Sequence, residues 1–320
     1  GCGAKVGRGV LSSALTKIAL PFDEVVTGAG DDAAVLRQSN GTFQVISTDH
    51  LRSLIDDPAL MTRIAAVHAL GDVWAMGAQP QVGLASIVVP QMSADLQART
   101  LTEITQVATE VLSAAGAQLV GGHTTMGAEL TIGFTVTGRK VTMPLTVSGA
   151  QPGDVLILTR PIGSGVILAA DMEGHAHGRF VAAVLAIMGQ AQDREAAVLA
   201  PVAHAMTDVT GFGLAGHVKA ICEASGLDAE LWQAAIPIYA GAQALSDAGV
   251  ASTLMLVNRT DAPIEGGADA LLYDPQTAGG LLAAVPAKQS VAVIDALCAA
   301  GCMGHVIGQL TKGNGHVGLR

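Results

Sequence analysis

The sequence predicts a two-domain protein of the α/β (α+β) class, because strands and helices alternate in both halves of the chain. Its 320 residues are enough for two domains of the usual ~100–200 residues each. Half of the residues are hydrophobic and only 3% are aromatic, so we expect helices packed tightly on sheets through small aliphatic side chains. A segment rich in proline and glycine, residues 149–154, separates the halves. We therefore predict domains over residues 1–148 and 149–320.

Capping residues and the spacing of apolar residues indicate the elements of the first half. Asp57 followed by Pro58 is typical of a helix start, and Ser93 precedes a stretch whose apolar residues recur every three to four positions. Residues 43–49 are predicted to form a strand that delivers Asp49 at its C-terminal end. The predicted elements are a strand over 43–49, a helix from Pro58 to about Met76, a strand over 81–89, a helix from Ser93 to about Ala115, and strands over 118–120 and 130–137.

The second half shows a similar alternation. Its predicted elements are a strand over 154–159, helices over about 163–172, 178–190, 193–204 and 211–225, shorter pieces that include 271–273 and 280–285, a helix over 288–300, and a last strand near 306–310. Periodicity alone does not give the order of the strands in a sheet. The sequence thus predicts the fold class and leaves the topology open.

Charge and hydrophobicity argue against two broad classes of partner. The net charge of −10 is unfavourable for binding nucleic acids or anionic membranes, which require basic patches. No apolar run approaches the ~18–20 residues that span a bilayer, and the first residues do not resemble a signal peptide. Cys298 and Cys302 lack paired metal-binding spacing and are expected to be packed or free thiols. We expect a cytoplasmic protein without nucleic-acid or membrane partners.

Four aspartates in short contexts rich in glycine or hydroxyl residues carry the strongest functional signal. They are Asp32 in Gly30-Asp31-Asp32-Ala33-Ala34, Asp49 in Ser47-Thr48-Asp49, Asp72 in Leu70-Gly71-Asp72, and Asp208 in Met206-Thr207-Asp208-Val209-Thr210-Gly211-Phe212-Gly213. Only 14% of the residues are charged, so acids at the ends of hydrophobic runs are not scattered at random. Carboxylates are preferred ligands of Mg²⁺, which accompanies nucleotide phosphates. The pattern predicts an ATP-using enzyme that binds Mg²⁺.

Three of these motifs also have a purely structural interpretation. Gly-Asp-Asp is ordinary turn chemistry. Asp72 is compatible with a buried acid that is satisfied by a hydrogen bond to His68, four residues earlier on the same helix. Asp208 is compatible with an N-terminal helix cap. The residues alone leave these alternatives open.

Two further segments carry weaker signals. Residues 121–124, Gly-Gly-His-Thr, follow an apolar strand and are a candidate anion-binding loop, in which His123 either places a water molecule or is structural. Cys2 and Lys5 lie in a glycine-flanked start that is expected to be mobile. They are a candidate nucleophile and a candidate phosphate contact, or else exposed residues without a role.

Seven motifs follow one another along the chain: Gly-Cys-Gly-Ala-Lys, Gly-Asp-Asp-Ala-Ala-Val, Ser-Thr-Asp, Gly-Asp-Val-Trp-Ala-Met-Gly, Gly-Gly-His-Thr, Met-Thr-Asp-Val-Thr-Gly-Phe-Gly-Leu-Ala-Gly-His and Asp-Pro-Gln-Thr-Ala-Gly-Gly. In this order they resemble the selenophosphate synthetase (selenide, water dikinase) family, from Gly1 to about Gln309. The runs 206–217 and 274–280 are the most specific. Gly-Asp-Asp also resembles thiamine-monophosphate kinase and other members of the aminoimidazole-ribonucleotide-synthetase-like superfamily.

This resemblance implies a two-domain fold, an activity and roles for individual residues. The N-terminal sheet domain would serve dimerisation and ATP binding, and the reaction would convert ATP, selenide and water to selenophosphate, AMP and orthophosphate. Cys2 and Lys5 would be catalytic. The implied Mg²⁺ ligands are Asp32, Asp72 and Asp208, and the implied nucleotide-binding positions are Lys5, Ala29, Gly30, Asp31, Asp49, Asp72, Gly122, His123 and Thr124.

The resemblance also implies partners and leaves two alternative functions. We expect a homodimer with ATP and selenide as substrates. Some relatives are fused behind a flavin-dependent oxidoreductase domain, so a flavin oxidoreductase, fused upstream or separate, is a further expected partner. The alternatives are another ATP-dependent enzyme, resembling thiamine-monophosphate kinase, and a non-catalytic carrier of nucleotide or selenium. The run 274–280 argues against the first, and the retained acids argue against the second.

Overall fold

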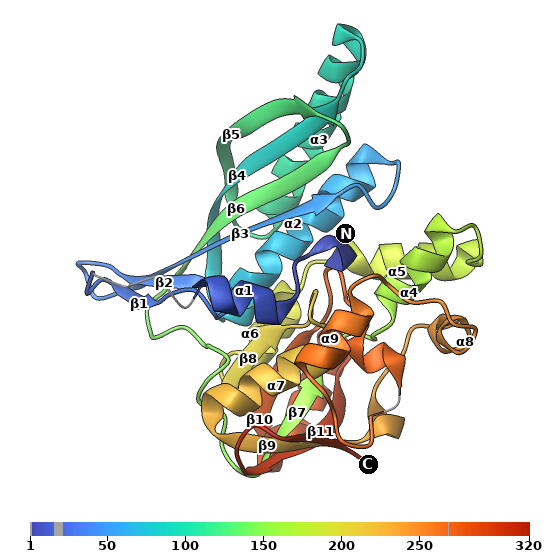
Figure 1. Cartoon of the computed structure of the whole chain (residues 1–320). Coiled ribbons are helices and arrows are strands. Elements are labelled where there is room, and N and C mark those ends of the chain that lie inside the picture. The colour runs from blue at the N-terminus through green and yellow to red at the C-terminus, as the bar shows by residue number, and fades with distance from the viewer. Residues whose placement is uncertain (1, 16–21, 268) are drawn as a thin grey trace.

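The computed structural model describes residues 2–15, 22–267 and 269–320. Two mixed sheets, each covered by helices, form an upper and a lower half in the view of Figure 1. The strand order is β1-β2-β3-β6-β4-β5 in the first sheet and β12-β9-β11-β7-β10-β8 in the second. The α/β (α+β) class predicted from the sequence is therefore confirmed.

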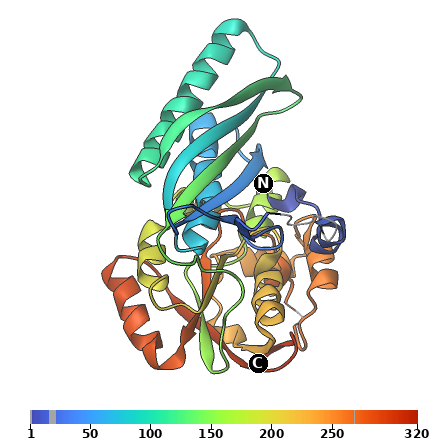
Figure 2. The same cartoon turned by 90° about the vertical axis from the view of Figure 1, so that its left-hand side faces the viewer.

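The first sheet and its helices are built from the N-terminal part of the chain. Their bounds are η1 (Cys2–Ala4), α1 (Arg8–Leu15), β1 (Val25–Thr27), β2 (Ala34–Arg37), β3 (Phe43–Arg52), α2 (Pro58–Ala75), β4 (Gln79–Pro90), α3 (Ala94–Ala114), β5 (Gln118–Gly127) and β6 (Thr131–Lys140). Helices α2 and α3 pack on one face of this sheet (Figure 2). On the strands β4 and β5, the side chains of Leu84, Val120 and Met126 are exposed.

The second sheet and its helices follow in sequence. Their bounds are β7 (Asp154–Leu158), α4 (Ser164–Met172), α5 (Gly178–Met188), α6 (Asp193–Leu199), β8 (Ala205–Asp208), α7 (Gly213–Ser225), β9 (Leu227–Leu231), η2 (Gln233–Ala235), α8 (Ala242–Asp247), α9 (Met255–Asp261), η3 (Ala270–Tyr273), β10 (Leu281–Pro286), η4 (Ala287–Gln289), α10 (Ser290–Ala299), β11 (His305–Lys312) and β12 (Val317–Leu319). None of the helices in the described ranges is long and apolar enough to cross a membrane.

Helix α2 is the structural link between the two halves. Asp57 caps its first turn by accepting hydrogen bonds from the backbone N–H groups of Ala59 and Leu60, and Pro58 occupies the first position, as predicted. The helix contacts β3 and β6 on one side and β8, α5 and α6 on the other. Nearly all of its residues after the first turn are buried, which explains why it is apolar around its whole circumference. Any polar side chain in its middle is therefore enclosed by both halves.

The N-terminal residues lie against the second half. The Gly9 N–H donates to Asp261 Oδ2 at 2.9 Å, and the Thr253 hydroxyl donates to the Gly3 carbonyl at 2.8 Å. Helix α1 packs near α9. The segment 2–15 thus lies at the junction of the two halves (Figure 1), although the sequence grouped it with the first domain.

Three sequence-based element assignments were wrong. The strand expected over 43–49 continues to Arg52, because β3 pairs with β6 along its whole length, and Asp49 lies within it opposite Phe134. Residues 121–124 belong to the edge strand β5 and not to a loop, since they pair with β4. The last predicted strand is followed by β12, which is only three residues long and gives little periodic signal.

Candidate functional site

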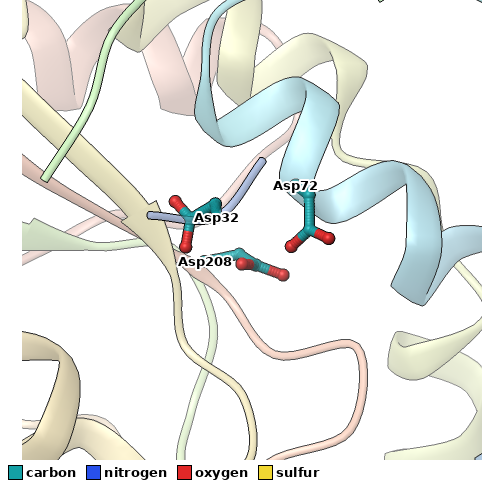
Figure 3. Close-up of side chains that lie close together, drawn as sticks. All are labelled: Asp32, Asp72 and Asp208. Atoms are coloured by element: carbon teal, nitrogen blue, oxygen red, sulfur yellow. The ribbon is translucent and has the colours of Figure 1, made fainter. Parts of the chain in front are cut away.

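Three of the sequence-predicted acids meet at one point, although they come from separate parts of the fold. Asp32 lies in the turn before β2, Asp72 on α2, and Asp208 at the C-terminal end of β8. One carboxylate oxygen from each of them lies within 4.8 Å of those from the other two. Figure 3 shows the three side chains gathered around a common space. We call Asp32, Asp72 and Asp208 the acid cluster.

The local sequence explains why α2 and β8 approach so closely. A side chain at Gly71 would place its Cβ 2.4 Å from Asp208 Oδ2. A larger residue at this position would therefore displace the Asp208 carboxylate from its place beside the turn of α2 that carries Asp72. The motif Gly71-Asp72 thus supplies both one acid and the space for another.

Hydroxyl groups orient two of the three acids. The Thr207 hydroxyl donates to Asp32 Oδ1 at 2.8 Å, which joins the second half of the chain to the first. The Ser47 hydroxyl donates to Asp72 Oδ2. In turn, Thr207 lies 3.2 Å from His217 Nδ1, and His217 Nε2 accepts the Thr210 N–H at 3.0 Å.

Asp72 and Asp208 are buried, and Asp32 is half-buried. The Oδ2 atoms of Asp32 and Asp208 are buried and have no hydrogen-bond partner in the described ranges. Burial, followed by the charges of the neighbouring acids, raises the pKa of Asp32 and Asp72 well above the ordinary value. Burial raises the pKa of Asp208 to about 6. Buried carboxylates in this arrangement fit a divalent cation with oxygen ligands, such as Mg²⁺.

Asp49 lies beside the cluster in a different electrostatic setting. Lys5 Nζ is 3.2 Å from its Oδ1, and His68 Nε2 is 3.4 Å from its Oδ2. Burial acts to raise the pKa of Asp49, but the neighbouring His68 and Lys5 side chains outweigh burial and lower it. Asp49 is therefore held ionised by groups of the protein itself.

These groups line two adjoining cavities. The first, of about 620 Å³, is bordered by Lys5, Asp49 and the acid cluster. The second, of about 630 Å³, is bordered by residues 28–34 and shares Asp31, Asp32, Ser47, Thr48, Phe212 and His217 with the first. The 28–34 turn thus borders a cavity next to the one that the acids line. Together the cavities offer room for a nucleotide whose phosphates point to the acid cluster.

Asp31 retains a structural role in the turn. Its Oδ1 accepts the Asp32 N–H at 2.9 Å, and its Oδ2 accepts the Val147 N–H at 3.3 Å. The ordinary turn chemistry considered from the sequence therefore applies to Asp31, whereas Asp32 presents an unpartnered oxygen to the cluster.

The other two structural interpretations were wrong. Asp208 does not cap α7, since that helix follows Phe212 and has no side-chain cap. Asp72 accepts its hydrogen bond from Ser47, and the His68 ring contacts Asp49 and Ala278. The free-thiol expectation holds for Cys298 and Cys302.

The structure does not bring every predicted position to the acids. Lys5, Ala29, Gly30, Asp31, Asp32, Asp49, Asp72 and Asp208 border the two cavities. Gly122, His123 and Thr124 are exposed on β5, at the opposite edge of the first sheet from β1, and border neither cavity. The side chain of Cys2 lies outside what the structure describes.

Sequence reasoning missed the groups that hold the acids in place. Thr207 and His217 lie inside the run 206–217 but were given no role. Their signal was present, because a threonine and a histidine in an otherwise apolar run require partners when they are buried. Ala278 carried no signal, since its contribution is a backbone N–H.

Comparisons with known proteins agree with this architecture. The profile described as AIR synthase related protein, N-terminal domain, matches residues 30–140, and the one described as AIR synthase related protein, C-terminal domain, matches residues 151–319. The solved structure of thiamine-monophosphate kinase from Stenotrophomonas maltophilia K279a superposes with a TM-score of 0.68 at 22% identity, over 98% of this chain and 96% of that one. This likeness concerns the fold.

Two curated relatives are more similar in sequence. The protein named Selenide, water dikinase from Burkholderia pseudomallei is 36% identical over 298 residues, which cover 89% of this chain and 84% of the relative. Its namesake from Burkholderia ambifaria is 36% identical over 340 aligned positions, which cover 99% of this chain and 93% of the relative. The region aligned with the second of these relatives therefore spans both halves of the chain.

Proposed function

The chain belongs to the selenide, water dikinase family, and we propose that the acid cluster, Asp49 and Lys5 form the site at which it splits ATP. The protein is accordingly an enzyme that makes selenophosphate from selenide, ATP and water and releases AMP and orthophosphate. The observation that supports this placement is the meeting of three carboxylates at the wall of a cavity, two of which have a buried oxygen without a hydrogen-bond partner among the described residues.

Asp32, Asp72 and Asp208 are the residues that would hold Mg²⁺. When bound, Mg²⁺ supplies positive charge that neutralises the polyphosphate and helps to orient it. The protein contributes the fixed positions of its three carboxylates. Thr207 holds Asp32 and Ser47 holds Asp72, so these acids need little rearrangement to bind a cation.

Lys5 is proposed to bind the terminal phosphate. Its ammonium group lies at the border of the first cavity and is held by Asp49 at 3.2 Å. A lysine acts as a compact point charge, which suits an oxyanion whose negative charge changes during phosphoryl transfer. Asp49 thereby positions the cation that faces the phosphates.

The segment 2–15 is proposed to shield the reaction from water. Ala4, Lys5 and Leu11 form one wall of the first cavity, and the segment is fastened to the second half through Gly3 and Gly9. Selenide at neutral pH is already ionised and strongly nucleophilic, so it needs little help from a general base. Excluding water until selenide has entered is then the main task of this wall.

Cys2 is proposed to act with selenide at this wall, because it lies three residues before Lys5. It either bonds selenium or orders the segment, and the Cys2→Ser variant tests its participation. We expect this variant to lose selenide-dependent product. Unchanged selenophosphate formation would remove Cys2 from the reaction.

The second cavity is proposed to hold the nucleoside end of ATP, with backbone groups of Ala29, Gly30 and Asp31 as contacts. Gly30 has φ 119°, a left-handed conformation that favours glycine, so the turn depends on this residue. Gly122, His123 and Thr124 lie away from the acids within one chain. A nucleotide contact by these residues requires a second copy, which is consistent with a homodimer formed through the first sheet. An oxidoreductase partner upstream stays a prediction.

The test of this function is phosphorus NMR of the purified chain with Mg²⁺ and ATP, with and without selenide, under anaerobic conditions. We expect selenophosphate, AMP and orthophosphate in equal amounts. ATP consumption without a selenium–phosphorus product would separate a working phosphate site from selenide capture. Nucleotide binding without any turnover would favour the carrier alternative.

A further inference from the structure

His68 contacts both halves of the molecule from the middle of α2. Its side chain is fully buried. The N–H of Ala278, in the segment before β10, donates to His68 Nδ1 at 3.3 Å. A ring nitrogen that accepts an N–H carries no proton, so the proton of the neutral ring lies on Nε2. That nitrogen faces Asp49 Oδ2 at 3.4 Å.

The backbone that contacts His68 is held in an unusual conformation. Ala278 has φ 47° and is the one non-glycine residue with positive φ in the described ranges. Its carbonyl accepts a hydrogen bond from Arg160 Nη1 at 2.8 Å, and Arg160 Nη2 donates to the Gln190 carbonyl at 2.6 Å. Such a conformation persists only where the surroundings fix it, and it tends to occur at functional sites.

The two glycines that follow leave this segment little freedom to move. A Cβ at Gly279 would lie 1.9 Å from the Val209 carbonyl oxygen, and one at Gly280 would lie 2.5 Å from the Arg160 backbone nitrogen. The segment is therefore packed directly against the residues that follow Asp208. It is a rigid part of the second half that presents one N–H to a side chain of the first.

On its other side, His68 reaches the N-terminal segment through one residue. Asp49 lies between the His68 ring and the Lys5 ammonium group, with one carboxylate oxygen toward each. A carboxylate on a strand can rotate about its side-chain bonds, and two fixed partners on opposite oxygens limit that rotation. The orientation of Asp49, and with it the place of Lys5, thus depends on His68.

We propose that His68 is a positioning residue that transmits the fixed place of Ala278 to Asp49 and so holds Lys5 at the cavity of the acid cluster. The relay is Arg160, Ala278, His68, Asp49 and Lys5, and it crosses the junction between the halves. Its consequence for catalysis rests on the proposed function, whereas its consequence for the place of Lys5 does not.

The test measures the reactivity of Lys5 in the full chain without substrates. Acetylation by an N-hydroxysuccinimide ester is followed by peptide mass spectrometry, with the exposed Lys312 as the internal reference. His68→Leu removes both ring contacts, His68→Asn retains an acceptor near the Nδ1 position, and His68→Gln retains a donor near the Nε2 position. His204→Leu is the matched control, because His204 forms a second histidine–aspartate pair, with Asp154 at 2.9 Å, in the other sheet.

We expect Lys5 acetylation to rise about fivefold in His68→Leu and His68→Asn, because a less fixed Asp49 would weaken its ion pair with Lys5. His68→Gln and His204→Leu should stay within about twofold of the wild type. In the Asp49→Asn background, Lys5 should be equally reactive with His68 and with the additional substitution His68→Leu. Equal Lys5 reactivity in the wild type and in a folded His68→Leu would overturn the proposal. If His68→Leu does not fold, Lys5 reactivity is compared between the wild type and His68→Asn, and equal reactivity would overturn the proposal.

Kinetics separate this proposal from the proposed function. In His68→Leu we expect kcat to fall on the order of tenfold while the dissociation constant for Mg²⁺ and ATP stays within about threefold, because the acid cluster is untouched. If the wild type makes no selenophosphate but Lys5 reactivity follows the predicted pattern, the function is wrong and the relay stands. If selenophosphate forms and Lys5 reactivity is constant among the variants, the relay is wrong and the function stands.

Discussion

The acid cluster and Asp49 border the same cavity, yet the protein shifts the pKa values of their carboxyl groups in opposite directions. Asp32, Asp72 and Asp208 face one another, and two of their oxygens lack a hydrogen-bond partner in the described ranges. Burial and mutual repulsion raise the pKa values of Asp32 and Asp72. Asp49 lies between Lys5 and His68, and its pKa is lowered. The charges of the protein thus outweigh burial at Asp49, whereas at the other three acids burial prevails and the pKa is raised.

This difference indicates which charges must come from outside. Three buried carboxylates cannot all ionise without a compensating cation. The cluster therefore gains from binding a divalent ion, whereas Asp49 is already compensated and is free to hold Lys5. A site with both arrangements presents cationic charge to the phosphates from two sources, one bound and one built into the chain.

The largest expected effect follows from breaking the cluster. Asp208→Asn removes one of its three charges, and we expect the rate of ATP turnover to fall at least about a thousandfold, because charge compensation of the phosphates is the main catalytic contribution. The measurement is AMP formation under saturating Mg²⁺. Asp171→Asn, at an exposed acid on α4, is the control and should keep normal turnover. Normal turnover by Asp208→Asn would remove Asp208 from the site.

Removing the positive charge of Lys5 should have a smaller effect on the rate of ATP turnover. Lys5→Met retains much of the length of the side chain and removes its charge, and we expect kcat to fall about a hundredfold with the acid cluster intact. Lys219→Met, on α7 outside both cavities, is the control. A loss of Mg²⁺ binding in Lys5→Met, with kcat otherwise preserved, would contradict the division of roles.

Acid should weaken the cluster and spare Asp49. Mg²⁺ must displace protons from acids whose folded-state pKa values are raised, to about 6 for Asp208. We expect the affinity for Mg²⁺ to fall about tenfold per pH unit as the pH decreases below about 6. Isothermal titration between pH 5 and 8 measures this, and an affinity that is independent of pH would contradict it. The Lys5–Asp49 pair should persist, because the pKa of Asp49 is lowered.

The smallest expected effects concern stability without Mg²⁺, and they have opposite signs. A folded-state pKa of about 6 against the ordinary 3.8 means that Asp208 destabilises the metal-free fold increasingly as the pH rises through this range. Asp208→Asn should therefore raise the free energy of unfolding at pH 8, on the order of 2 kcal/mol. Asp49→Asn should lower it by about 1 kcal/mol, since a paired acid is lost. Urea unfolding of the two variants measures both, and changes of the same sign would refute the comparison.

The sequence predicted the parts of this site whose residues lie in short, recognisable motifs. Asp32, Asp72 and Asp208 were recognisable because an acid in an apolar run is unusual, and the start of α2 was recognisable from Asp57 and Pro58. These signals are local in sequence, so they can be recognised without knowing the topology of the fold.

The sequence did not predict how Asp49 differs from the other acids. His68 was considered as a possible partner of Asp72 because the two are four residues apart on one helix, but the ring contacts Asp49 and Ala278. The Ala278 contact joins residues 210 positions apart and uses a backbone N–H that any residue except proline could provide. Likewise, residues 121–124 were predicted to form a loop because they are polar and show no alternating pattern. They belong to a strand because they pair with β4, and this pairing cannot be recognised from the local sequence.

The most direct test of the two modes of neutralisation is a titration of Mn²⁺, as a spectroscopic substitute for Mg²⁺, into nucleotide-free protein at pH 8 with detection by electron paramagnetic resonance. We expect the wild type to bind the ion, Asp208→Asn to lose at least about a hundredfold in affinity, and Asp49→Asn to stay within about threefold of the wild type. Equal binding by the wild type and Asp208→Asn, or an equally large loss in Asp49→Asn, would contradict the distinction between the acid cluster and Asp49.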